Sequence, residues 1–275
     1  MDKLLDDLPW SRRLHEHPEP KTQISAATAI ASMDLAKVES KGDTLKNLVR
    51  GLMYMISGKT SSADYTRQLA QARAARALAW ICYLDEVPGI VLEGAQQGNS
   101  DHLSTLSRLL VETHDRAVLV ELIALVGWLA NASDDYAQLV GSDTDILRTL
   151  AEHLAARAPA IQYKAAWALA CLARGKNKMR ILSGDNHERM MRNLTAILRS
   201  NDLQCSQMAA RCAGALANGN RANAALMSRQ AGGKASNLYL ALKACSQSKD
   251  KSLRMEAQWA EGVLARSFTE DSVGG

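Results

Sequence analysis

The stretch that decides the fold is Ala165-Ala166-Trp167-Ala168-Leu169-Ala170-Cys171-Leu172-Ala173. It aligns without gaps with five other nine-residue segments, which span residues 26–34, 74–82, 122–130, 209–217 and 257–265. We take the apolar residue at the eighth place of each copy as its anchor. Consecutive anchors are 48, 48, 43, 44 and 48 residues apart: Met33, Ile81, Leu129, Leu172, Leu216 and Leu264. A nearly constant period in this range predicts an array of repeated structural units.

Glycines follow the same period. Gly94, Gly141, Gly184 and Gly232 each come after an apolar stretch, and they are 47, 43 and 48 residues apart. Between a glycine and the next anchor lies a second apolar run with 3-to-4 spacing, as in residues 103–110, 146–154 and 190–198. This spacing is typical of a helix with one buried face. Each repeat is therefore predicted to be a helix, a short turn and a second helix.

The composition agrees with an all-helical chain. Ala and Leu together make up 81 of the 275 residues, against 12 aromatic residues, so strong helix formers dominate. No stretch of 18 apolar residues is free of charge, and we expect neither a signal peptide nor a transmembrane segment. The five cysteines are odd in number and widely spaced, which favours reduced thiols in a cytoplasmic or nuclear protein.

Within the anchor helix, the residues 0, 3, 4 and 7 places before the anchor share one face and are apolar, which predicts that this face forms the core. Place −2 lies on the other side, yet it holds only Ala or Gly. A residue that is always small predicts that another helix backbone passes close by. The one break in the core pattern is Glu261 at place −3 of the last copy, which predicts a solvent-facing cap there.

These repeats resemble armadillo repeats. Residues 164–173 resemble the third helix of that family, and Val91-Leu92-Glu93-Gly94-Ala95 resembles the glycine junction before its second helix. The resemblance covers about residues 21–268, between a lead segment at 1–20 and a polar tail at 269–275. It implies an all-α, right-handed superhelical solenoid of about six armadillo-like repeats, whose third helices line a concave groove. It also implies a non-catalytic scaffold for protein–protein interaction.

Four of the five tryptophans occupy two places beside the core face. Trp80 and Trp128 are at place −1, and Trp167 and Trp259 are at place −5. Cations occupy the same flank, so the full set of candidate partner-binding residues is Arg76, Trp80, Trp128, Lys164, Trp167, Arg211 and Trp259. An exposed row of this kind suits a peptide ligand. The alternative is that the indoles fill space between repeats.

The expected partner is an acidic or amphipathic segment of another protein. Import receptors of the armadillo family pair Trp at place −5 with Asn at place −1, and no copy here has that Asn. Arg76 and Arg211 would also repel a lysine-rich ligand, so the catenin branch is the closer parallel. A co-chaperone that promotes nucleotide exchange on Hsp70 is a further alternative, and it rests on the family resemblance alone.

Charge is uneven along the chain, with a net charge of −6 over residues 1–156 and +10 over residues 157–275. The densest basic stretch is Arg174, Lys176, Lys178 and Arg180, in the turn predicted after the fourth anchor helix. Solvated charge is one interpretation of this stretch. Binding of nucleic acid or of another acidic surface by the basic half is the other.

No set of residues in the sequence indicates catalysis. The histidines form no HExxH motif, and no C-x-x-C occurs. Cys205 and Cys212 share a helix face but have no further ligands nearby for zinc. Residues 232–235 lack the first glycine and the final Ser or Thr of a phosphate-binding loop. We therefore predict that the protein is not an enzyme and has no cofactor or metal site.

Overall fold

The structure is a computed structural model, and it describes residues 20–31, 43–58, 64–96, 101–184, 186–229 and 235–269. Within these ranges every regular element is a helix, and one isolated β-bridge joins Arg229 to Ala235. The all-α prediction is confirmed. The chain divides into two compact units, Met1–Val140 and Gly141–Gly275.

The first unit contains the helices α3 Pro20–Ala31, α4 Asp43–Ile56, α5 Asp64–Ile81, α6 Glu86–Gln96, α7 Asp101–Glu112, α8 Arg116–Ala132 and α9 Asp134–Val140. In it α5 packs between α3 and α8, and α7 packs against α8. The second unit contains α10 Thr144–His153, α11 Pro159–Leu172, α12 Asn177–Ile181, α13 Asn186–Leu198, α14 Leu203–Ala217, α15 Arg221–Ser228, α16 Asn237–Cys245 and α17 Lys251–Thr269. There α14 packs between α11 and α17, while α13 packs against α10 and α16.

The described residues of the six sequence copies fall on α3, α5, α8, α11, α14 and α17, which we call the inner helices; residues 32–34 of the first copy lie outside the described ranges. The predicted core face is buried: in α11, Ala165, Ala168, Leu169 and Leu172 are all 0% exposed. The same places are buried in α5, α8 and α14, because helical periodicity puts them on one side. The anchor Met33 lies outside the described residues.

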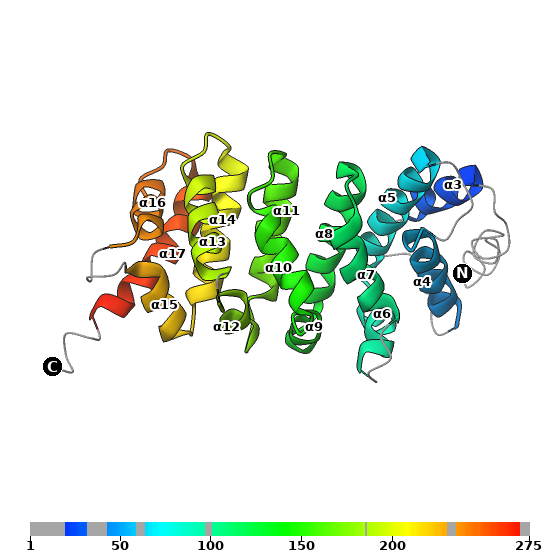
Figure 1. Cartoon of the computed structure of the whole chain (residues 1–275), viewed down its shortest axis with the longest axis horizontal. Coiled ribbons are helices and arrows are strands. Elements are labelled where there is room, and N and C mark those ends of the chain that lie inside the picture. Colours follow the sequence, from blue (N-terminus) through cyan, green and yellow to red (C-terminus); the bar gives the residue numbers. More distant parts are fainter. Residues whose placement is uncertain are drawn as a thin grey trace. The chain divides into compact units, whose positions relative to one another are not determined.

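Among the described residues, four repeats contain one more helix than the sequence predicted. The short helices α6, α9, α12 and α15 lie along the lower edge of their own unit in Figure 1. Gly141 and Gly184 do lie in turns, as predicted, but Gly94 lies inside α6. Residues 97–100 and Gly232 are outside the described ranges.

Polar residues set several helix starts. The Asp115 carboxylate accepts a hydrogen bond from the Val118 amide at 2.9 Å at the start of α8, and Asp202 does the same for Cys205 at the start of α14. Such caps satisfy amides that have no partner within the helix. They fix where α8 and α14 begin, and therefore which residues of these two helices face outward.

Among the described residues, no helix combines the length and the apolar character needed to cross a membrane.

Candidate functional site

In the first unit, two of the predicted site residues are joined through a third aromatic ring. Tyr83, just after the end of α5, lies between them: its ring centroid is 5.9 Å from that of Trp80 and 4.5 Å from that of Trp128. Trp80 is 41% exposed and Tyr83 is 56% exposed, and Trp128 is half-buried. We call Trp80, Tyr83 and Trp128 the aromatic cluster. It spans two adjacent inner helices, α5 and α8.

Tyr83 is the functional candidate that the repeat alignment missed. It follows the anchor Ile81 by two residues, so it falls outside the nine-residue copies. The signal that would have found it is its spacing of three residues from Trp80, since residues three apart on a helix are neighbours. The backbone keeps that spacing, because the Cys82 amide still bonds to the Leu78 carbonyl at 3.0 Å.

Charged side chains border the aromatic cluster. Arg76 lies one helical turn before Trp80 on α5 and is exposed. Asp85 and Glu86 follow Tyr83 after one intervening residue and are also exposed. The exposed aromatic surface therefore has a cation on one side along the chain and two carboxylates on the other.

In the second unit, Lys164 and Trp167 lie together on α11. The Lys164 ammonium is 5.5 Å from the centroid of the Trp167 ring and 5.9 Å from that of Tyr163. This is cation–π range. Arg211 on α14 is exposed and lies 4.0 Å from the Glu256 carboxylate on α17. Both cations that were predicted to meet an acidic ligand here thus already contact groups of the protein.

The Trp259 side chain packs against a neighbouring helix and is also partly exposed to solvent. It is 38% exposed, but a Cβ placed on Gly214 would come within 2.3 Å of its ring. The small residue at place −2 of α14 therefore accommodates an indole from the next inner helix, where the sequence had predicted a helix backbone. Gly262, at the same place in α17, has nothing within 4 Å. One part of the Trp259 ring therefore fills space between repeats, and another part is exposed and available to a ligand.

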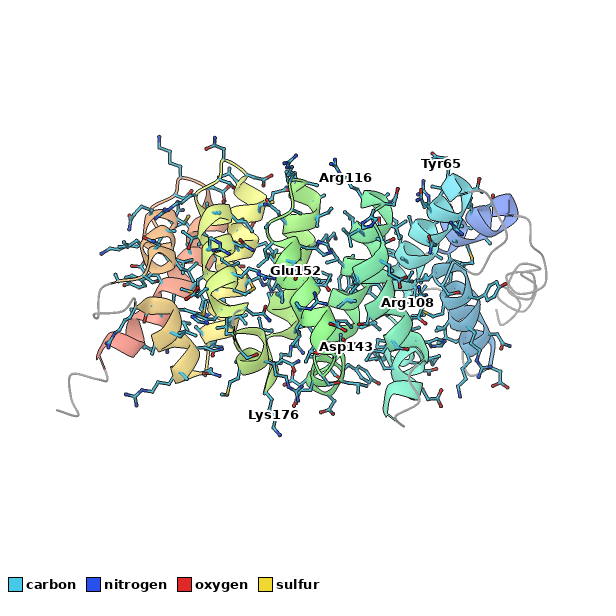
Figure 2. The ribbon with its side chains drawn as sticks, viewed as in Figure 1. Tyr65, Arg108, Arg116, Asp143, Glu152 and Lys176 are labelled. Carbon is cyan, nitrogen blue, oxygen red and sulfur yellow. The ribbon has the colours of Figure 1, made fainter. Side chains whose placement is uncertain are left out.

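The basic stretch predicted as a turn contains the helix α12. Lys178 donates to the Asn218 carbonyl, and Arg180 donates to the Gly141 carbonyl at 3.4 Å and to Asn177 Oδ1 at 3.3 Å. Lys176 extends away from the ribbon (Figure 2) and is exposed. Two of these four cations are thus held by oxygen atoms of the chain itself.

The described residues hold no group of three His, Cys, Asp or Glu side chains placed to bind a metal ion. All five cysteines are buried and reduced. Burial raises the pKa of the Cys171 thiol to about 11 and that of Cys212 to about 12. A thiol that stays protonated near neutral pH is a poor nucleophile.

No protein-family model matches the sequence, and no curated protein matches it. Solved structures, by contrast, are similar over most of the chain. An engineered protein from a structural genomics consortium is 22% identical with a TM-score of 0.74, over 95% of this chain and 97% of that one. A designed armadillo repeat protein in complex with the peptide (KR)4 is 16% identical with a TM-score of 0.70, over 92% of this chain and 97% of that one.

A chain from a structure of the interaction between cadherin and beta-catenin is 17% identical with a TM-score of 0.68. The match covers 94% of this chain and 45% of that one. At sequence identities this low, the similarity establishes the fold and says nothing about function. Together with the six inner helices, the comparisons show that this chain has the armadillo-like repeat fold, an all-α solenoid.

Proposed function

We propose that the protein is a non-catalytic scaffold that binds a segment of another protein on the exposed flank of its inner helices. The observation that carries this proposal is the aromatic cluster, in which Trp80 of α5 and Tyr83 just after it are 41% and 56% exposed, and Trp128 comes from the adjacent helix α8. Large aromatic side chains are enriched at the centres of protein interfaces, because they bury much area at little entropic cost. Here they stand in contact with one another, already ordered before a partner arrives.

The similar structures support binding of a protein segment. One is a designed armadillo repeat protein in complex with a peptide, and another concerns the interaction between cadherin and beta-catenin. The designed protein's peptide, (KR)4, is basic. In this chain an acidic group is favoured on the Arg76 side of the cluster, away from Asp85 and Glu86.

The partner segment we propose has a large apolar side chain next to an acidic one. The apolar group would lie on the aromatic cluster, and the carboxylate would pair with Arg76, which is exposed one turn away. Within the second unit, Lys164, Arg211 and the indoles Trp167 and Trp259 would form a separate contact surface on the flank of its own inner helices. Because the first two already contact Trp167 and Glu256, they contribute less than the cluster.

Nucleic-acid binding by the basic half is less well supported. Lys178 and Arg180, in its densest basic stretch, donate to carbonyl groups of the protein. A cation held in this way is less available to displace counterions from a phosphate backbone.

The test is an affinity selection from a displayed peptide library, carried out on the full-length protein and on the Trp80→Ala/Tyr83→Ala variant. We expect the wild-type protein to enrich peptides with an aromatic or leucine side chain beside Asp or Glu. The double variant should bind these peptides at least about tenfold more weakly. Neither residue is part of the buried core, so the variant should retain its helical circular dichroism and lower the melting temperature only slightly.

The matched control is Tyr65→Ala. Tyr65 is 77% exposed and projects from the opposite end of α5 (Figure 2), so this variant removes an exposed aromatic ring from the same helix but not from the cluster. It should bind like the wild type. Equal binding by Trp80→Ala/Tyr83→Ala, or no enrichment on the wild-type protein, would refute the proposal.

A further inference from the structure

The second unit contains a cavity of about 780 Å³ that shares no residue with the inner helices. It lies between α13 on one side and α15 with the start of α16 on the other, and its walls include Met191, Arg192, Arg199, Leu226, Arg229 and Leu238. This volume is within the usual range for ligand pockets. No residue of α11, α14 or α17 lines it, so it is separate from the face assigned above.

The floor of the cavity is apolar. On one side, Met191 of α13 is half-buried. On the other side, Leu226 of α15 is 40% exposed and Leu238 of α16 is 1% exposed. A leucine with that much exposed surface is available to an incoming apolar side chain, whose burial is worth roughly 25 cal/mol for each Å² removed from water. The apolar floor therefore favours a ligand with an apolar face.

The rim of the cavity is basic. Arg192 and Arg199 project from α13 and are exposed, and Arg229 lies across the cavity at the end of α15. The one acidic residue among those lining the cavity is Glu188, and His187 lies next to it with Nδ1 2.9 Å from the Gly184 carbonyl oxygen. Three guanidinium groups against one carboxylate favour an anionic ligand.

The spacing of the arginines selects the shape of that ligand. Arg192 and Arg199 are seven residues apart, so at 1.5 Å per residue they lie about 10 Å apart along α13. One phosphate or carboxylate would pair with both only if the two side chains converged on it, whereas two separate acidic groups can pair with both when they are extended. Two acidic side chains seven residues apart on a second helix have the same spacing, and such a helix can present apolar residues to the floor between them.

We propose that this cavity binds an acidic amphipathic helix of a partner protein. Its apolar face lies on Met191 and Leu226, above the buried Leu238, and its carboxylates pair with Arg192 and Arg199. Because the residues involved are different, this site and the inner-helix site can be occupied independently.

The test uses a fluorescein-labelled synthetic peptide made of two repeats of Leu-Glu-Glu-Leu-Leu-Glu-Glu, with the full-length protein. Fluorescence anisotropy should show saturable binding, and the Arg192→Glu/Arg199→Glu variant should weaken it at least about tenfold. The methyl resonance of Met191 in methionine-labelled protein should shift on addition of the peptide, which reports binding at this cavity and not elsewhere. A peptide of the same composition in scrambled order should bind at least several-fold more weakly.

The charge-matched control is Arg157→Glu/Lys249→Glu, which changes two exposed cations of the same unit outside the cavity and should bind like the wild type. Trp80→Ala/Tyr83→Ala should also leave the Met191 shift intact, so the two proposals can fail separately. Absence of binding, an unshifted Met191 methyl, or unchanged binding by Arg192→Glu/Arg199→Glu would overturn the proposal. Equal binding of a 20-nucleotide single-stranded DNA with the same arginine dependence would overturn it too, since it would identify a site for polyanions in general.

Discussion

Gly214 joins two inner helices because it has no side chain. A Cβ there would lie 2.3 Å and 2.5 Å from two ring carbons of Trp259, closer than non-bonded carbon atoms approach. We expect Gly214→Ala to push the indole out of its place and to destabilise the protein by about 1–3 kcal/mol, the usual cost of overpacking. Urea unfolding followed by circular dichroism would measure the change.

Gly262→Ala is the matched control for this substitution. It lies at the same repeat place in the next inner helix, but a Cβ there meets nothing within 4 Å. Because alanine favours helix more than glycine does, we expect it to be neutral or to stabilise by up to about 1 kcal/mol. If Gly214→Ala behaved like Gly262→Ala, the contact with Trp259 would not be tight in solution.

The buried thiols make stability depend on alkaline pH. The folded protein raises the pKa of Cys171 to about 11 and of Cys212 to about 12, from an ordinary value of 9.0 in the unfolded chain. The folded state therefore holds these protons more tightly, so the stabilisation is complete below pH 9 and is lost as the pH rises toward the folded values. Between pH 8 and pH 10, each thiol should lower the free energy of unfolding by about 1.4 kcal/mol.

Urea unfolding at pH 8 and pH 10 tests this expectation. The loss of stability between the two pH values should be about 2–3 kcal/mol smaller in Cys171→Ala/Cys212→Ala than in the wild type. Comparing each protein with itself cancels any packing defect that the substitutions cause. An identical pH dependence in the two proteins would contradict the prediction.

At the scale of helices, buried asparagine connects the short helices to the layers beside them. Asn223 of α15 is 4% exposed, and its Nδ2 donates to the Lys178 carbonyl at 2.9 Å and to the Leu216 carbonyl at 3.0 Å. Asn223→Ala leaves both carbonyls without this donor, and we expect a loss of about 1–3 kcal/mol in thermal or urea unfolding. Asn201→Ala, at an exposed position in the turn before α14, should change stability by less than about 0.5 kcal/mol.

The inner helices were predictable from sequence because their signal is local. Apart from Glu261 in α17, they have apolar residues at places 0, −3, −4 and −7, and this spacing puts one buried face on a helix. The short helices were not predicted because they carry no such local signal. Five-residue α12 has no room for a period, and its buried Asn177 looks like a loop residue until its contacts are known.

The candidate site was predictable only in part. Sequence placed Trp80 and Trp128 at the same repeat place, but their connection runs through Tyr83, outside the repeated segment. The contact of Trp259 with Gly214 depends on how α17 packs on α14, which no sequence pattern records. The cavity beside α13 combines residues from three helices, and its basic rim is visible only once they are folded.

At the scale of the whole molecule, a repeat array is stabilised mainly by contacts between neighbouring units. The inner helices differ in how many neighbours they have. Among the described helices, the main packing partner of α3 is α5, whereas α8 packs against α5, α7 and α9. The free energy for local opening should therefore be lower for α3 than for α8.

Hydrogen–deuterium exchange of the full-length chain, read out by mass spectrometry, tests this expectation. After correction for intrinsic exchange rates, amides of α3 should exchange at least about tenfold faster than those of α8, which has ten buried residues along its length. In the second unit, α14 packs against α11, α13, α15 and α17 and should be among the slowest helices to exchange. Equal protection of α3 and α8 would mean that the first unit opens only as a whole, and that nearest-neighbour packing does not set its local stability.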